Sequence, residues 1–133
     1  MLVVISPAKK LDENCNKNVV SRLTIPTYLE NSSKIVKSLR KYSVNKLSEL
    51  MNVSEKISLL NYERYIKWSL PFNKKNSHPA LLLFQGDVYK GLKANSFNNQ
   101  QLDFAQQSLR IISGLYGILK PFDLIYIYLN LDS

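Results

Sequence analysis

Two short apolar runs along the chain predict buried β-strands. The first is Leu2–Ile5, which Ser6-Pro7 ends, and the second is Ala80–Phe84, which follows a polar loop. Neither run alternates apolar with polar side chains, and this is typical of a strand that is covered on both faces. The pattern therefore predicts two strands inside the protein.

Apolar positions three and four residues apart predict helices around these strands. Asn31-Ser32-Ser33 is expected to cap the first helix, which runs to about residue 42. Ser43 and Ser54 are expected to cap helices over 44–51 and 55–68. A further helix is predicted over 99–112. The apolar positions of the 55–68 helix include Ile57, Leu60 and Ile66.

The order strand, helices, strand, helix predicts a mixed α/β (α+β) fold in which buried strands are surrounded by helices. At 133 residues and 45% hydrophobic content, the chain is expected to form one domain with a core. No apolar stretch approaches the roughly 20 residues of a membrane span, and no export signal is apparent. We therefore expect a cytoplasmic protein with no membrane partner.

Charge is distributed unevenly along this chain, whose net charge is +8. Residues 1–50 carry nine basic and four acidic groups, residues 51–80 carry five and two, and residues 81–133 carry four and four. Such asymmetry is typical of a protein that binds a polyanion, although a solvated lysine-rich surface is the alternative. Lys34, Lys37 and Lys41 recur on one side of the first predicted helix, which makes that helix basic and amphipathic.

Polar residues follow each predicted strand. After the first strand, Ser6, Lys9 and Lys10 are suited to meeting a phosphate, or else form a turn with solvated lysines. After the second strand, Asp87 has the chemistry of a general base, a metal ligand or a helix cap. The spacing matches neither a P-loop nor a dinucleotide-binding motif.

A third cluster lies near the end of the chain, where Gly114 and Gly117 bracket two residues after a predicted helix. A second short helix would make this a helix-hairpin-helix-like element, whose free backbone N–H groups contact a nucleic-acid phosphate. Arg110 and Lys120 would add positive charge. The alternative is a glycine that ends a helix, followed by a tight connection.

Three motifs together carry a family resemblance. They are Ile5-Ser-Pro-Ala-Lys-x-Leu-Asp12, Phe84-x-Gly-Asp-Val-Tyr-x-Gly-Leu92 and Leu109-Arg-x-x-Ser-Gly-Leu-Tyr-Gly-x-Leu-x-Pro-x-Asp123. In this order and spacing they resemble the signatures of the YaaA family, also called DUF328 or UPF0246. Family members continue beyond the third motif for about as long again. The resemblance thus implies that residues 1–133 are a single incomplete domain, the N-terminal half of a YaaA-like protein.

The resemblance also implies a function. Members are cytoplasmic bacterial proteins of the peroxide (oxidative) stress response that limit intracellular iron, and they are similar to DNA-binding proteins with a helix-hairpin-helix-like element. For this chain the implied activity is non-enzymatic, sequence-independent DNA binding through phosphates. The expected DNA contacts are Lys9, Lys10, Lys34, Lys37, Lys41, Arg110, Gly114, Gly117 and Lys120.

Two alternatives remain beside this hypothesis. The first is an enzyme acting on a nucleotide or nucleic acid, with Ser6, Lys9 and Asp87 in a strand-end pocket. The second is a truncated family member with no function of its own. No metal or cofactor is expected, because His78 is the only histidine and two carboxylates make a poor Fe(II) site. Cys15 is the only cysteine, so a disulfide scaffold is excluded and no resolving thiol is present.

Overall fold

The computed structural model describes residues 2–7, 10–12, 15, 22–72 and 77–126. The fold is mixed α/β, which confirms the predicted class. In chain order the elements are β1 (Val3–Ile5), β2 (Lys10–Leu11), α1 (Leu29–Leu39), α2 (Val44–Met51), α3 (Glu55–Lys67), β3 (His78–Pro79), α4 (Ala80–Leu83), β4 (Phe84–Gln85), α5 (Asp87–Leu92), the 3-10 helix η2 (Ala94–Ser96), α6 (Asn99–Ser108), β5 (Leu109–Ser113), β6 (Gly117–Leu119) and β7 (Leu124–Ile125).

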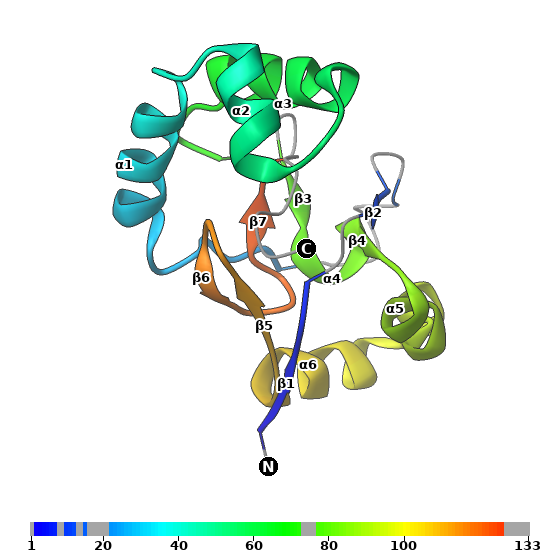
Figure 1. Ribbon diagram of the computed structural model, residues 1–133. Helices are drawn as coiled ribbons and strands as arrows, with labels where there is room; N and C mark the ends of the chain where they lie inside the picture. Colours follow the sequence, from blue (N-terminus) through cyan, green and yellow to red (C-terminus); the bar gives the residue numbers. More distant parts are fainter. Residues whose placement is uncertain (1, 8–9, 13–14, 16–21, 73–76, 127–133) are drawn as a thin grey trace.

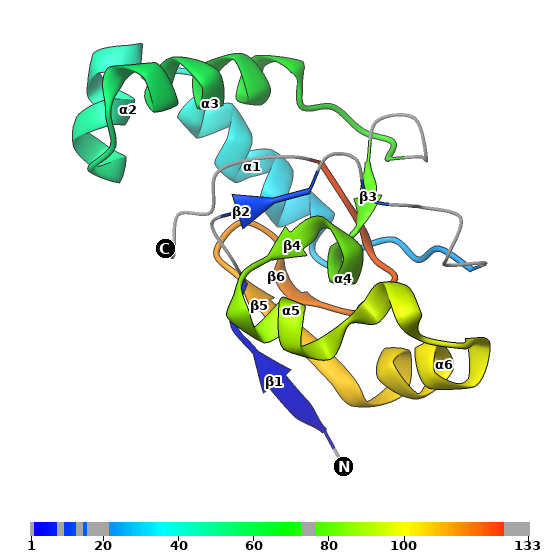
Figure 2. The ribbon, with the colours of Figure 1, turned by 90° about the vertical axis from the view of Figure 1, so that its right-hand side faces the viewer.

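The strands lie between two groups of helices. Figures 1 and 2 both place α1, α2 and α3 at one end of the molecule and α5 and α6 at the other. The main sheet has the order β1-β5-β6, and antiparallel pairs β2-β4 and β3-β7 lie beside it. β1 is parallel to β5, with Val3 opposite Leu109, and β5 is antiparallel to β6, with Ile112 opposite Ile118. The first strand of the chain therefore lies at an edge of this sheet.

The burial predicted for the first strand is wrong, although the strand itself is present. Leu2, Val3 and Val4 are 60%, 45% and 55% exposed. The reason is the edge position of β1, since no described element packs on its outer side. An apolar run indicates a tendency to be buried, but a covering element must be present to satisfy it.

The second predicted strand is instead mostly a helical turn. Ala80–Leu83 forms α4, and only Phe84 and Gln85 are extended. All four α4 residues are buried, so the run correctly indicated burial but not conformation. A short continuous apolar run fits a buried helix segment as well as a buried strand, because it has no period.

Local sequence determines where α2 and α3 begin. The Lys46 N–H donates to Ser43 Oγ at 3.2 Å, and the Ile57 N–H donates to Ser54 Oγ at 3.3 Å. Both predicted serine caps are thereby confirmed. α1 begins earlier than predicted, at Leu29, so the cap expected at residues 31–33 is wrong.

The predicted apolar stripe of α3 is wrong as well. Ile57, Leu60 and Ile66 are 42%, 45% and 51% exposed, and the helix instead buries a face that includes Ser58 and Tyr65. Ser58 Oγ donates to the Val44 carbonyl at 2.6 Å, so a hydrogen bond to α2 fixes the orientation of α3. Tertiary packing has overridden the periodicity of the sequence here.

Tyr116, in the third motif, is central to the core. Its side chain is fully buried, and its Oη accepts hydrogen bonds from Trp68 Nε1 and from the Tyr126 N–H, both at 3.1 Å. Phe72 packs edge-on against both Trp68 and Tyr116, with ring centroids 5.4 and 6.1 Å away. This cluster joins the end of α3 to the β5-β6 turn and to β7.

The predicted helix-hairpin-helix-like element is a β-hairpin. α6 ends at Ser108 and the next five residues form β5, so the helix predicted over 99–112 is four residues too long. Burial alternates along β5, with Leu109, Ile111 and Ser113 buried and Ile112 exposed. Parallel pairing with β1 provides the backbone partners that favour the strand, because β-branched residues fit a pleated surface well.

Candidate functional site

The first two motifs meet at a small antiparallel pair. Leu11 lies opposite Phe84 in the β2-β4 ladder, and the Asp12 N–H donates to the Leu83 carbonyl at 2.7 Å. Tyr89 Oη donates to the Ser6 carbonyl, also at 2.7 Å. The first two motifs, whose paired residues are 73 and 75 positions apart in the sequence, thus lie side by side.

A pocket of about 410 Å³ lies beside this pair. Its polar lining combines two ammonium groups with one carboxylate and neutral donors and acceptors, and its floor is apolar. Such a surface is suited to a ring that carries a phosphate. The lining residues are Asp12, Leu81, Leu82, Phe84, Gln85, Tyr89, Lys90, Lys93, Ala94 and Ser96.

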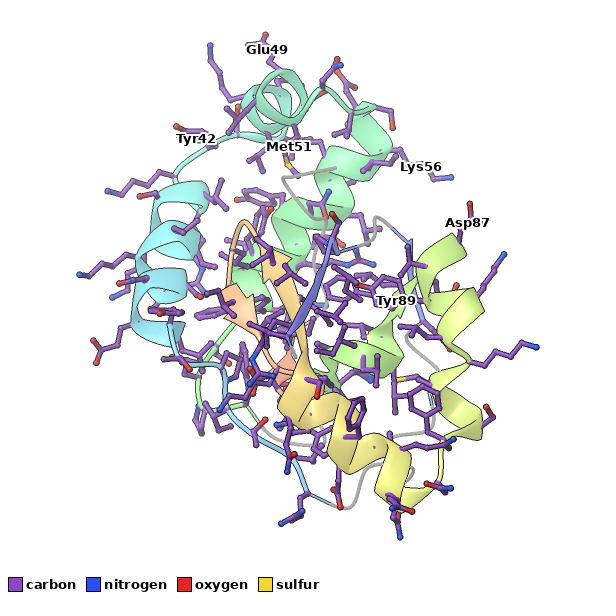
Figure 3. All side chains as sticks on the ribbon, turned by 90° about the horizontal axis from the view of Figure 1, so that it is seen from below. Tyr42, Glu49, Met51, Lys56, Asp87 and Tyr89 are labelled. Carbon is purple, nitrogen blue, oxygen red and sulfur yellow. The ribbon has the colours of Figure 1, made fainter. Side chains whose placement is uncertain are left out.

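Tyr89 is the buried polar member of this lining. Its side chain is 8% exposed, and Figure 3 shows it pointing inward from α5. Burial raises the pKa of Tyr89 above its usual range. The phenol therefore stays protonated at neutral pH and serves as a hydrogen-bond donor to the Ser6 carbonyl.

Neither Ser6 nor Asp87, which were predicted for an enzymatic pocket, lines this one. Asp87 lies exposed in the first turn of α5, and its side chain points outward, away from Tyr89 (Figure 3). Ser6 contributes its carbonyl to Tyr89, and its side chain is not part of the lining. Lys9 lies outside the described residues. Asp12 supplies the carboxylate of the pocket.

Sequence reasoning did not assign the polar lining residues to a pocket, Lys90, Lys93 and Ser96 among them. Lys90 lies in the last turn of α5, and Lys93 is the left-handed residue that ends this helix, so the two are close in sequence. That spacing was available in the sequence. The closeness of Asp12 to this turn was not, because it depends on the β2-β4 pairing.

The second candidate surface is the solvent face of α1. Lys34 and Lys37 are exposed on the helix. The buried side of the helix carries Val36 and Leu39, so at 3.6 residues per turn these two lysines point away from the core. The helix ends at Leu39, before the predicted residue 42, so exposed Lys41 lies in the turn that follows it. The predicted basic amphipathic helix is therefore present. Within the described ranges, no salt bridge involves these lysines.

The hairpin turn packs against the start of α1. Ser32 Oγ donates to the Leu115 carbonyl at 2.8 Å. Gly117 has φ +72°, and a Cβ at this position would lie 3.1 Å from the Tyr28 ring. The turn predicted to contact DNA thus lies beside the helix whose opposite face carries the two exposed lysines.

The remaining predicted DNA contacts lie apart from this face or already have partners. Arg110 Nη1 donates to the carbonyls of Gln106 and Leu109, both at 2.7 Å, and so closes the end of α6. Lys120 and Gly114 are exposed near the hairpin. The side chain of Lys10, like Lys9, lies outside the described part of the chain.

One side-chain pair has no sequence signature at all. Cys15 Sγ lies 3.6 Å from His78 Nδ1, although the two residues are 63 positions apart. Cys15 is buried, with 9% of its surface exposed. Considered separately in the sequence, each residue gave no indication of a partner.

Two kinds of feature are absent from the described ranges. There, no three histidine, cysteine, aspartate or glutamate side chains gather closely enough to hold a metal ion. None of the helices seen in the same ranges has the length and apolar character needed to span a bilayer.

The fold and its sites define a small α/β protein in which three sequence motifs assemble around one pair of parallel strands. A family model described as "Peroxide stress protein YaaA" matches residues 1–130, and the chain belongs to this family. The recognition made from the three motifs is thereby confirmed.

Several relatives support this assignment. UPF0246 proteins of Dechloromonas aromatica, Teredinibacter turnerae and Cellvibrio japonicus are 49%, 48% and 46% identical to it over 128 residues. In each comparison the match covers 96% of this chain and about half of the relative, 49%, 50% and 49% respectively. The chain thus spans about half the length of these curated relatives.

Proposed function

We propose that this member of the peroxide stress family binds DNA without sequence preference and without catalysis. The observation that carries the proposal is the exposed lysine face that Lys34 and Lys37 form on α1, with Lys41 in the turn that follows. Lysine ammonium groups on flexible stems attract backbone phosphates without reading bases. A net charge of +8 adds long-range attraction to a polyanion.

Such binding offers a physical route to peroxide resistance. Ferrous iron converts peroxide into hydroxyl radicals, and these damage DNA where they form. Protein that covers the phosphates also displaces the cations condensed on them, because DNA binding releases counterions. Iron held near DNA would be displaced with them, so hydroxyl radicals would form farther from the DNA.

The test is a DNA titration of two charge-matched double variants at several salt concentrations. Lys34→Gln/Lys37→Gln removes two charges from the α1 face, and Lys90→Gln/Lys93→Gln removes two charges from the pocket. Each neutralised phosphate adds about 0.9 to the slope of log K against log salt. We expect the α1 variant to lower the affinity and reduce this slope by about 2, and the pocket variant to change neither much.

Two results would contradict the proposal. One is an affinity for DNA that does not change between low and moderate salt. The other is an equal loss of affinity in both double variants, because that would show a response to net charge and no role for a particular face.

A second candidate function is binding of a phosphorylated small molecule for catalysis, and the pocket beside β2-β4 is the observation that favours it. Lys90 and Lys93 would hold the phosphate, and the Asp12 carboxylate would act as the base. If only Lys90→Gln/Lys93→Gln weakened the binding of a nucleotide in the same titration, the ligand site would be this pocket.

A further inference from the structure

One face of the main sheet carries Arg110 and three apolar side chains that are about half exposed. Side chains of residues that lie opposite each other in a sheet point to the same side, so Ile112 and Ile118 share a face. Val4 lies on that face too, because it is opposite Arg110, two residues before Ile112. Val4, Ile112 and Ile118 are 55%, 41% and 49% exposed, and we call them the open face. On the other side of β5, Ile111 is fully buried.

The edge of this sheet is open as well. Among the described elements β1 pairs only with β5, so its outer edge has backbone groups without ladder partners. Figure 2 shows β1 extending from the body of the molecule with no element along its outer side. On the side opposite the open face, Val3 borders a groove of about 620 Å³ that also includes Phe104, which is 66% exposed.

Exposure on both sides conflicts with the sequence of β1. The run Leu2–Ile5 is typical of a strand with both faces covered, yet Val3 and Val4 are each about half exposed. Soluble monomers rarely expose contiguous apolar surface unless something binds there. A covering element is therefore expected, and the described residues of this chain do not supply it.

The length of the relatives indicates what that element is. Their chains are about twice as long as the matched region, so each relative has a second half of similar length that can pack on this surface. We propose that the open face and the free edge of β1 form the docking surface for that other half of the family fold. The occupant is an apolar surface of a second polypeptide segment, which packs on Val4, Ile112 and Ile118 and covers β1.

The experiment compares this chain with a chimera. The chimera joins the chain, after Tyr126, to the part of the Dechloromonas aromatica relative that follows the matched region. Hydrogen exchange of the β1 amides is expected to slow at least about tenfold in the chimera, because covered and paired strands exchange through larger openings. The same comparison is then made for Val4→Glu and for Val88→Glu, a control on α5 with the same 55% exposure.

The two variants separate docking from a general effect of charge. Val4→Glu should change the Tm of the 133-residue chain little and lower that of the chimera by several degrees, whereas Val88→Glu should have a similar small effect in both. Unchanged β1 exchange in the chimera, or equal effects of both variants there, would overturn the proposal. If the chimera does not yield folded protein, the two halves are co-expressed, and failure to co-purify then overturns it.

A second copy of this chain is the competing occupant. Analytical ultracentrifugation of the 133-residue chain tests it directly. A dimer that Val4→Glu dissociates and Val88→Glu does not would assign the open face to self-association and overturn docking of the other half.

Discussion

Asp123 ends the third motif and joins the turn at residues 120–123 to Thr24. Its side chain is buried, with 2% of the residue exposed. Oδ1 accepts from Thr24 Oγ1 at 2.5 Å, and Oδ2 accepts from the Lys120 N–H at 2.9 Å. The Asp123 N–H donates to the Lys120 carbonyl at 3.0 Å, and this hydrogen bond closes a turn. The Pro-x-Asp ending of the motif thus has a structural explanation.

We expect Asp123→Ala to lower the free energy of unfolding by about 2–3 kcal/mol, because it leaves buried donors without a charged acceptor. Asp103→Ala is the matched control. Asp103 is half-exposed, and its ion pair with Arg22 spans 3.3 Å at the surface, so its loss should cost less than about 1 kcal/mol. Urea denaturation measures both, and equal effects would contradict the role given to Asp123.

Tyr65 gives the protein a predicted alkaline sensitivity. The residue is 1% exposed, and its Oη has no hydrogen-bond partner among the described residues. Burial raises the pKa of Tyr65 to about 12, against a small opposing effect of Arg64. Between pH about 10 and 12 the folded state then holds a proton that the unfolded state has lost. Stability should therefore fall as the pH rises through this range, by up to about 1.4 kcal/mol per pH unit.

Tyr65→Phe should reduce the loss of stability at alkaline pH. Near neutral pH the variant should be as stable as the wild type or more stable by about 1 kcal/mol, because no unpartnered hydroxyl is buried. Thermal unfolding at pH 7 and at pH 11 measures both effects. A variant that loses stability at pH 7 and keeps the full alkaline fall would show that this account of Tyr65 is wrong.

Among the elements, the β5-β6 hairpin depends most clearly on one residue. Gly117 has φ +72°, a conformation that is costly for any residue with a Cβ, and the Tyr28 ring limits the space there. Gly91 is a useful contrast in α5, because a Cβ at that position meets nothing within 4 Å.

Gly117→Ala should lower the free energy of unfolding by about 1–2 kcal/mol, through backbone strain and the contact with Tyr28. Gly91→Ala should raise it by about 0.5–1 kcal/mol, because alanine favours a helix. Denaturant titrations of the two variants should therefore shift in opposite directions. Shifts in the same direction would contradict this explanation of at least one glycine.

Elements set by local sequence were predictable, whereas those set by distant partners were not. Ser43 and Ser54 cap their helices through N–H groups three residues away, so the sequence contains the whole interaction. Leu109 and Ile112 fit an apolar helical stripe as well as they fit a strand. Only the pairing of β5 with β1 determines that they form a strand. The exposure of α3 apolar residues likewise follows from a contact of Ser58 with α2.

For the molecule as a whole, the family could be predicted from the sequence. The positions of the site residues relative to one another could be predicted only in part. The lysines of α1 share a face because helix geometry relates neighbouring residues. Asp12 and Lys93 share a pocket because two distant segments pair. Cys15 and His78 are also far apart in the sequence and are brought into contact by the fold. Distances of this kind depend on the full topology, which the periodicity of one segment does not contain.

The pairing of β1 with β5 also determines when the sheet can form during synthesis. Val3 can pair with Leu109 only after the ribosome has added Leu109, more than 100 residues later. At about 5–20 residues per second, this delay amounts to roughly 5 to 20 s. Throughout that time the apolar start of the nascent chain lacks its strand partner, and exposed apolar segments of this kind favour aggregation until the sheet forms.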